Sequence, residues 1–126
     1  MSLILDTNAL IWLITGDPAL GPLSRTRLEG EPRLCVSDIS VFEISIKAAK
    51  RKLDVPFGLA MQIDQLGITR VRIQDEHLDA MRTLPFHHND PYDRYLIAQS
   101  IVDSMPIVTA DLAFSQYGVR VIDARK

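Results

Sequence analysis

The chain has 126 residues, a formal net charge of −2, and a composition that is 47% hydrophobic and 24% charged. This length and composition are typical of one soluble globular domain, which we assign to residues 1–126, and they leave little room for a second. The negative charge argues weakly against nucleic-acid binding, which usually depends on an excess of lysine and arginine. However, acids concentrated at a metal lower the net charge, so the net charge can mislead about a basic surface elsewhere on the chain.

Cysteine content and hydropathy exclude two further classes of protein. Cys35 is the only cysteine, so no intrachain disulfide can form, and its apolar neighbours favour a buried small side chain over a catalytic thiol. The apolar stretches are too short for a membrane span, and the N-terminal residues lack a basic leader followed by an apolar segment. These features predict a cytoplasmic protein.

Short apolar runs alternate with longer amphipathic segments along the chain. The first half predicts a strand at 3–5, a helix over 9–14, a helix over 22–28, a strand at 33–36 and a helix over 38–50. The second half predicts a helix from about 57 to 66, a strand at 69–73, helices over 75–83 and 91–103, a strand at 106–109, a short helix after 111 and a strand at 119–122. Apolar and charged residues alternate at 69–73, which indicates a strand near a sheet edge. The whole pattern predicts an α/β fold, with a parallel sheet and helices on both faces.

Acidic residues lie at or just beyond the ends of several predicted strands. Asp6 directly follows the first strand, and Asp111 lies just past the fourth. Glu43 is in the first turns of the helix after the second strand, whereas Asp90 and Asp93 begin the helix before the fourth strand. Because ligands bind outside the carboxyl ends of the strands in an open parallel sheet, we expect these acids at or near one edge.

Each acid also has a structural explanation of its own. Asp90 followed by Pro91 is typical of an N-cap and a first helical residue, and Asp93 would then suit the helix dipole. Asp111 can cap the helix after it, and Asp6 can accept hydrogen bonds from nearby backbone amides. An unsatisfied acid at the end of a central apolar strand is costly, so Asp6 is the hardest to explain in this way.

Glu43 has two structural explanations. The segment from Ser40 to Glu43 matches a capping box, and Glu43 can pair with Lys47 one turn further along the helix. Taken together, however, four or five neighbouring carboxylates repel one another, and a divalent cation removes that repulsion. Oxygen ligands favour Mg²⁺ or Mn²⁺ over zinc, and such an ion serves the hydrolysis of phosphodiesters.

Histidine and aromatic residues offer weaker alternatives. His87 and His88 form a rival zinc pair, but adjacent side chains point in different directions and no cysteine or third histidine lies nearby. Four aromatic residues can stack on bases, although their helical spacing favours the core or an interface. They are Trp12, Phe42, Tyr92 and Tyr95.

Four sequence blocks occur in the order typical of a known family. They are 3–8 (LILDTN), 37–44 (SDISVFEI), 88–99 (HNDPYDRYLIAQ) and 109–111 (TAD), and they span nearly the whole chain. The chain thereby resembles a PIN domain, and most closely the toxin subunit of VapBC-type toxin–antitoxin pairs. This resemblance implies a single PIN-like domain whose parallel sheet has the strand order 3-2-1-4-5, with the first strand at the switch point.

The resemblance also implies which side chains form the site. An acidic quartet would hold Mg²⁺ or Mn²⁺: Asp6, Glu43, Asp93 and Asp111. Asp6 and Asp93 would be the firmest ligands, while Glu43 and Asp111 would hold a second ion or its waters, or orient the nucleophile. Hydrogen bonds from three neighbours would support the quartet: Thr7, Asn8 and Thr109. Asp90 is a fifth acid beside it, and we favour Asp93 over Asp90 as the ligand because Asp93 lies inside the helix.

The implied activity is hydrolysis of RNA by in-line attack of water on a backbone phosphate, which leaves 5′-phosphate and 3′-hydroxyl ends. The family further implies a homodimer, and a cognate antitoxin whose tail would block the site and enter an apolar groove near the early helices. The basic residues expected to contact RNA phosphates are Lys47, Lys50, Arg51, Lys52 and Arg94. The alternatives are that these side chains are merely solvated or that they bind the antitoxin.

Three rival functions are open at this stage. An aspartyl-phosphate phosphatase would use Asp6 as its nucleophile but usually needs a second acid two residues on, where the chain has Asn8. A phospho-accepting signalling domain would need a buried lysine late in the chain, and the last lysine before Lys126 is Lys52. A catalytically silent RNA-binding or scaffolding PIN domain is the third rival, and the complete quartet argues against it.

Overall fold

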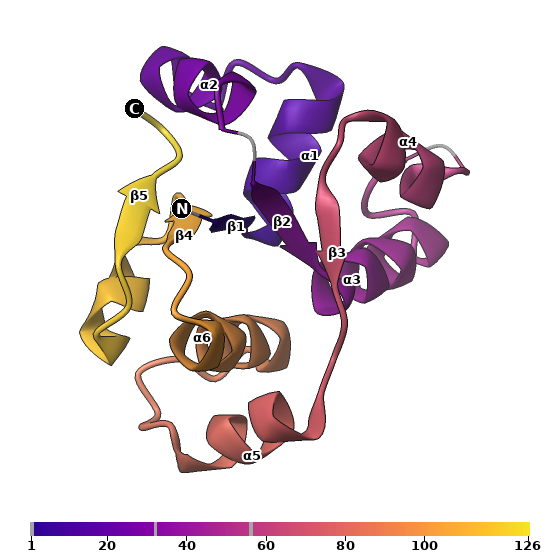
Figure 1. Cartoon of the computed structure of the whole chain (residues 1–126). Coiled ribbons are helices and arrows are strands. Elements are labelled where there is room, and N and C mark those ends of the chain that lie inside the picture. Colours follow the sequence, from indigo (N-terminus) through magenta and orange to yellow (C-terminus); the bar gives the residue numbers. More distant parts are fainter. Residues whose placement is uncertain (1, 32, 56) are drawn as a thin grey trace.

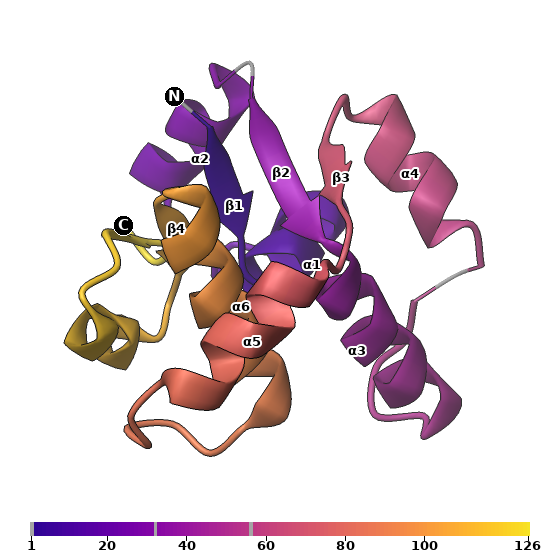
Figure 2. The same ribbon diagram turned by 60° about the horizontal axis from the view of Figure 1, so that its bottom comes forward.

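A sheet of five parallel strands forms the centre of the computed structural model, which describes residues 2–31, 33–55 and 57–126. The strands are β1 (Leu3–Leu5), β2 (Leu34–Ser37), β3 (Thr69–Val71), β4 (Ile107–Thr109) and β5 (Val121–Asp123). Their order is β3-β2-β1-β4-β5, which confirms the predicted topology. Figure 2 shows β1, β2 and β3 side by side, with β3 at the edge that its charge alternation predicted.

Helices cover both faces of this sheet. They are α1 (Thr7–Thr15), α2 (Pro22–Glu29), α3 (Asp38–Ala49), α4 (Leu59–Gln65), α5 (Asp75–Thr83), α6 (Pro91–Asp103) and the 3-10 helix η1 (Leu112–Tyr117). In Figure 1, α5 and α6 lie on one side of the sheet, and α1 and α2 lie on the opposite side. None of the helices in the described part of the chain has the length and apolar character needed to cross a membrane.

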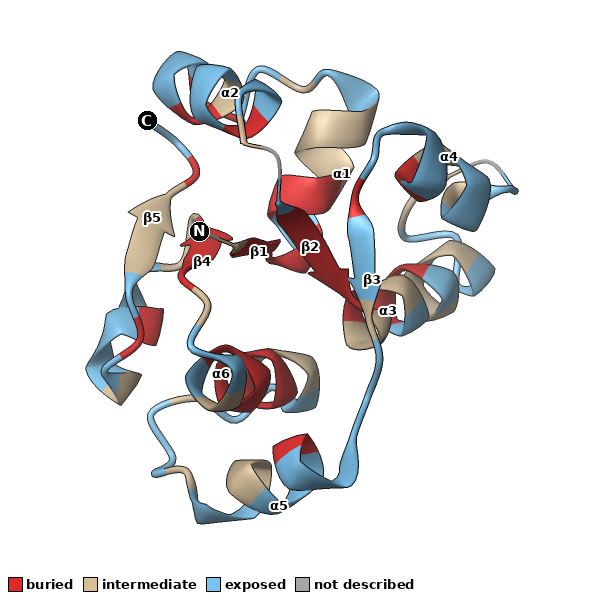
Figure 3. Ribbon diagram, in the orientation of Figure 1, coloured by how far each residue is buried: buried red, intermediate tan, exposed pale blue. Residues whose placement is uncertain are grey.

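The core has two layers because successive strand residues point to opposite faces of a sheet. In β1, Leu3 and Leu5 pack in a cluster with residues of α1, α3 and α4. Ile4 joins a second cluster with Leu96 of α6 on the other face. Figure 3 shows β1, β2 and β4 as the most deeply buried part of the sheet. The free thiol of Cys35 belongs to the second cluster, which confirms it as a buried small side chain.

Local hydrogen bonds shift several element boundaries from those predicted. Helix α1 begins at Thr7 rather than at residue 9 because the Asp6 carboxylate caps it. Helix α3 is capped by Ser37, whose hydroxyl accepts from the Ile39 amide at 3.1 Å. The predicted capping box that starts at Ser40 is therefore wrong, because Ser40 already lies inside the helix. The last strand begins two residues later than predicted.

Candidate metal centre

Parallel pairing places Asp6 beside Thr109 at the carboxyl edge of the sheet. Leu5 of β1 pairs with Val108 of β4, so the residues that follow them, Asp6 and Thr109, are neighbours. The Thr109 hydroxyl donates to Asp6 Oδ2 at 2.5 Å, and the Ala9 amide donates to Asp6 Oδ1 at 2.7 Å. Asp6 is thus buried at the end of a central strand with its carboxylate fixed from two directions.

The same Thr109 hydroxyl orients the loop that carries Asp111. It accepts a hydrogen bond from the Asp111 amide at 3.0 Å. The Asp111 carboxylate caps η1 through Oδ1, which accepts from the Ala113 amide at 3.1 Å, as its capping explanation predicted. Its other oxygen, Oδ2, lies 2.9 Å from His88 Nε2, which is an ion-pair distance without hydrogen-bond geometry.

Glu43 is buried in α3 with both carboxylate oxygens engaged. The Thr7 hydroxyl donates to Glu43 Oε1 at 2.8 Å and lies 3.1 Å from the Ser40 hydroxyl. The Lys47 ammonium lies 2.7 Å from Glu43 Oε2, which confirms the pair predicted from their spacing. Thr7 thus donates a hydrogen bond to Glu43, and the supporting role that the resemblance implies for it stays a prediction.

Asp90 and Asp93 have different environments although both stand at the start of α6. Asp90 is the N-cap, and its Oδ1 accepts from the Asp93 amide at 3.0 Å, so its capping explanation is confirmed. The Asp93 carboxylate has a much weaker partner among the described residues, His88 Nδ1, at 3.8 Å from Oδ2. Asp93 is thus a half-buried carboxylate whose charge lacks a close counter-ion.

Two of these acids carry an electrostatic cost in the metal-free protein. Burial raises the pKa of Asp6 to about 6, with Glu43 and Asp111 adding to the rise while its two hydrogen bonds oppose it. Burial also raises the pKa of Asp93 to about 7, and the neighbouring Asp90, Glu43 and Asp6 raise it further. A divalent cation offsets both the burial of these carboxylates and their mutual repulsion, since it supplies the positive charge that they lack. These residues therefore fit a metal ion.

His88 is the member of this cluster that sequence reasoning missed. One of its ring nitrogens and the carboxylates of Asp93 and Asp111 supply ligand atoms that all lie within 4.8 Å of one another. The ring packs edge-on against Phe114, at 5.2 Å between centroids. His87 is exposed and packs against a different ring, that of Tyr117, so the two histidine side chains diverge as their adjacency predicted. The signal in the sequence was its position two residues before Asp90, at the start of the block 88–99 that matches the family.

Arg94 has a structural role, which corrects its assignment as a phosphate contact. The residue is only 6% exposed. Its guanidinium donates, over 3.0–3.2 Å, to four backbone carbonyls: those of Met81, Leu84, Pro85 and His88. It also lies 4.0 Å above the ring of Phe86. A buried guanidinium whose donors hold the loop before α6 has no face left for RNA, and its task is to position that loop.

Comparison with known proteins identifies the family. A family model described as a PIN domain matches residues 3–120. The chain belongs to the PIN-domain family. Among curated proteins, none is similar enough to match the chain.

Solved structures share the architecture of this PIN domain at low sequence identity. VapBC2 from Rickettsia felis, bound to a promoter DNA fragment, has a TM-score of 0.74 at 14% identity, with 98% of both chains covered. DNA-bound VapBC from Salmonella typhimurium has a TM-score of 0.72 at 18% identity, again with 98% of both chains covered. A toxin–antitoxin complex from Klebsiella pneumoniae has a TM-score of 0.70 at 18% identity and the same coverage. At these identities the likeness concerns the fold alone.

The remaining predicted residues of the PIN domain lie around the acids or away from them. Asn8 is exposed in the first turn of α1 and has no side-chain hydrogen bond to the described residues, so its supporting role stays a prediction. Tyr95 is buried in the core, and Trp12 packs against the core from α1. Phe42 and Tyr92 form an edge-to-face pair between α3 and α6, with 6.3 Å between ring centroids.

Proposed function

We propose that this PIN domain is a Mg²⁺- or Mn²⁺-dependent endoribonuclease and the toxin of a toxin–antitoxin pair, acting in the cytoplasm. The observation that carries the proposal is the convergence of Asp6, Glu43, Asp93 and Asp111, with raised pKa values at two of them. Capping explains one oxygen each of Asp6 and Asp111. It does not explain why the Asp93 carboxylate lies among other acids without a close counter-ion.

In this proposal Asp6 and Asp93 are the principal metal ligands, with Asp111 and His88 facing the same space. A bound divalent ion would lower the pKa of a water molecule and stabilise the charge that develops on the scissile phosphate. The protein's own contribution is to hold the ligands still. Thr109 and the Ala9 amide fix Asp6, and Thr7 fixes Glu43.

RNA would reach the acids along the basic end of α3. Lys50, Arg51 and Lys52 are exposed at the C-terminal end of the helix that also carries Glu43. Such residues contact phosphates without reading sequence, and they explain how a chain with a net negative charge can bind RNA. Lys47 stands apart from them because it is paired with Glu43.

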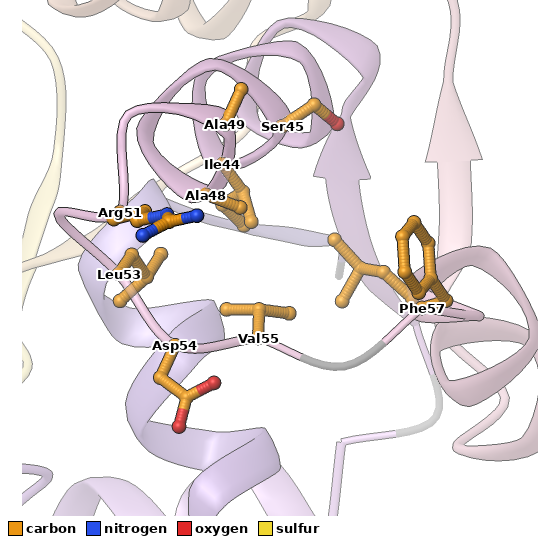
Figure 4. A pocket seen from close by; sticks show the side chains of 10 residues that line it. Ile44, Ser45, Ala48, Ala49, Arg51, Leu53, Asp54, Val55 and Phe57 are labelled. Carbon is orange, nitrogen blue, oxygen red and sulfur yellow. The ribbon is translucent and has the colours of Figure 1, made fainter.

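An apolar groove beside the basic end of α3 suits the expected antitoxin. Its volume is about 650 Å³. The lining side chains come mainly from α3 and the segment that follows it, and they include Ile44, Ala48, Leu53, Val55, Phe57 and Leu59. Figure 4 shows several of these side chains facing one another. The structural neighbours from Rickettsia felis and Salmonella typhimurium are VapBC complexes, which supports a partner of this kind.

The groove is tested by identifying the neighbouring open reading frame and co-expressing its product, as the candidate antitoxin, with this chain. Phe57→Ser should weaken co-purification at least tenfold, because Phe57 is fully exposed and offers its whole ring to a partner. Leu23→Ser on α2 removes an exposed apolar side chain outside the groove and should leave co-purification unchanged.

The expected homodimer is tested separately. Sedimentation of the chain alone measures its oligomeric state.

Nuclease activity is tested on end-labelled RNA with Mg²⁺, Mn²⁺ or EDTA. Cleavage should require either ion, stop in EDTA and leave 5′-phosphate ends. Acetyl-phosphate labelling run in parallel should give no acyl-phosphate on Asp6. Labelling without cleavage would instead favour phosphoryl transfer, and RNA binding without cleavage at any metal concentration would favour a silent binding domain.

A further inference from the structure

The acids of the quartet differ in whether a positively charged side chain contacts them. Glu43 has a cation in direct contact, the Lys47 ammonium 2.7 Å from Oε2, and its other oxygen accepts from the Thr7 hydroxyl. Asp6 receives only neutral donors, the Thr109 hydroxyl and the Ala9 amide. Asp93 has no cationic partner among the described residues closer than the 3.8 Å to His88.

We propose that the Lys47 ammonium is a built-in cation at the position where a second metal ion would otherwise bind, so that this centre holds one divalent ion. The inference rests on the proposed function and deepens it, since it concerns how many ions the same acids bind. The single ion then belongs to the half of the quartet formed by Asp6 and Asp93.

The geometry at Glu43 supports this division. For Glu43 to hold a second ion, Oε2 would have to accept that ion while an ammonium lies 2.7 Å away. Two cations in contact with one carboxylate repel each other, and solvent screens the Glu43 side less than the Lys47 side, because the side chains are 8% and 43% exposed. Displacing Lys47 would first require breaking a close ion pair with a carboxylate that is almost fully buried.

Lys47 is also well placed to stay charged. Its ammonium lies 2.7 Å from the Glu43 carboxylate, and a lysine side chain is ordinarily protonated at neutral pH. Asp90 and Asp93, at the start of α6, also interact electrostatically with this ammonium. A fixed charge of this kind is present whether or not metal is bound, unlike a second ion, whose occupancy depends on concentration.

Counting bound Mn²⁺ tests the inference without any measurement of cleavage. We would titrate the intact chain with Mn²⁺ and follow free ion by electron paramagnetic resonance, with equilibrium dialysis as a second measurement. The wild-type chain should bind one ion per chain. Lys47→Met keeps the length of the side chain and removes its charge, and this variant should bind two.

Two further variants control for effects other than charge at this position. Lys47→Arg keeps the positive charge and should still bind one ion. Lys50→Met removes a lysine from the same helix that has no ion pair among the described residues, and it should also bind one. Circular dichroism of each variant with Mn²⁺ present establishes that it is folded before ions are counted.

The outcomes separate this inference from the proposed function. Two ions bound to the wild-type chain would overturn the inference about Lys47 but not the proposed function, and this count needs no variant. One ion on folded Lys47→Met would overturn it as well, because something other than Lys47 would then limit the number. Binding of no ion at all would contradict the metal centre itself, and the inference with it.

Discussion

At the scale of single residues, the acids of the quartet combine a charge that a metal needs with hydrogen bonds that the fold needs. Asn retains the shape and capping ability of Asp but removes its charge. We therefore expect Asp6→Asn, Asp93→Asn and Asp111→Asn each to reduce cleavage by more than the roughly 10- to 100-fold typical of changes outside the ligand shell. Their Tm in EDTA should equal or exceed that of the wild-type chain, because like charges are removed from a repelling cluster. A large fall in Tm for all three would show that the acids are structural caps.

The raised pKa values of Asp6 and Asp93 predict how the stability of the metal-free protein depends on pH. Both folded-state values, about 6 and about 7, lie above the ordinary carboxyl value of 3.8, so between about pH 4 and pH 7 the folded chain binds more protons than the unfolded chain. The free energy of unfolding contributed by these groups therefore falls as pH rises through that window. In EDTA, Tm should be a few degrees higher at about pH 5 than at about pH 7.5. The matched comparison is Asp93→Asn, which should lose much of this dependence; an unchanged dependence would contradict the assignment.

A conservative substitution of Thr109 should show whether its hydroxyl orients the metal-binding acids or only stabilises the fold. Its hydroxyl donates to Asp6 and accepts from the Asp111 amide, so Thr109→Val removes both bonds while preserving volume in a fully buried position. We expect metal affinity, measured by Mn²⁺ titration, to fall roughly 10- to 100-fold, as for other residues that orient a ligand. Thr109→Ser keeps the hydroxyl and should restore most of the affinity. Equal losses in both variants would point to packing instead.

At the scale of helices and strands, the sequence predicted the features that depend on neighbouring residues and missed those that depend on packing between distant segments. Strand and helix types followed from hydrophobic period, and the cap of α6 followed from Asp90 and the proline after it. The start of α3 was also predicted, but its cap was not, because Ser37 and Ser40 are both plausible caps and only the end of β2 selects between them. The role of Arg94 could not be predicted either, since its carbonyl partners lie in the last turn of α5 and in the loop after it, whose path depends on the packing of α5 against α6.

The loop before α6 should depend on Arg94 for its stability. Arg94→Met keeps much of the aliphatic stem but leaves four carbonyl partners without their donor. Hydrogen bonds to a charged group contribute about 1.5–3 kcal/mol each and are not additive, so we expect a loss of roughly 2–4 kcal/mol in the free energy of unfolding, measured in urea. Arg94→Lys should not restore it, because one ammonium cannot reach all four carbonyls. Unchanged stability with weaker RNA binding would instead restore Arg94 to the RNA surface.

At the scale of the whole molecule, topology explains why much of the site was predictable. Once the sheet is parallel and β1 lies between β2 and β4, the residues after these strands must meet at one edge. That argument placed Asp6 and Asp111 at one edge because each follows a predicted strand of a parallel sheet, whereas the strand order itself was taken from the family resemblance. It did not find His88, whose approach to Asp111 depends on a loop and not on a strand end. The pairing of Lys47 with Glu43 was predicted from their spacing, whereas the proposal about the number of ions also needed the Thr7 contact.

The distribution of charge over the whole molecule leads to the last prediction, which concerns how an acidic chain holds RNA. Neutralising Lys50, Arg51 and Lys52 together should weaken RNA binding to a similar extent across sequences, because phosphate contacts carry no sequence information. The slope of log affinity against log salt should flatten by about 0.7 for each phosphate that is no longer neutralised, or about 2 for all three residues. Filter binding over a salt series, in an Asp6→Asn background that prevents cleavage, measures both quantities. Arg51 also lines the apolar groove, so Lys50→Gln with Lys52→Gln separates the two roles: this pair should flatten the salt slope while leaving antitoxin co-purification intact. If the triple variant binds RNA with unchanged affinity and slope, the basic end of α3 is not the RNA surface, and these side chains are solvated or belong to the antitoxin interface.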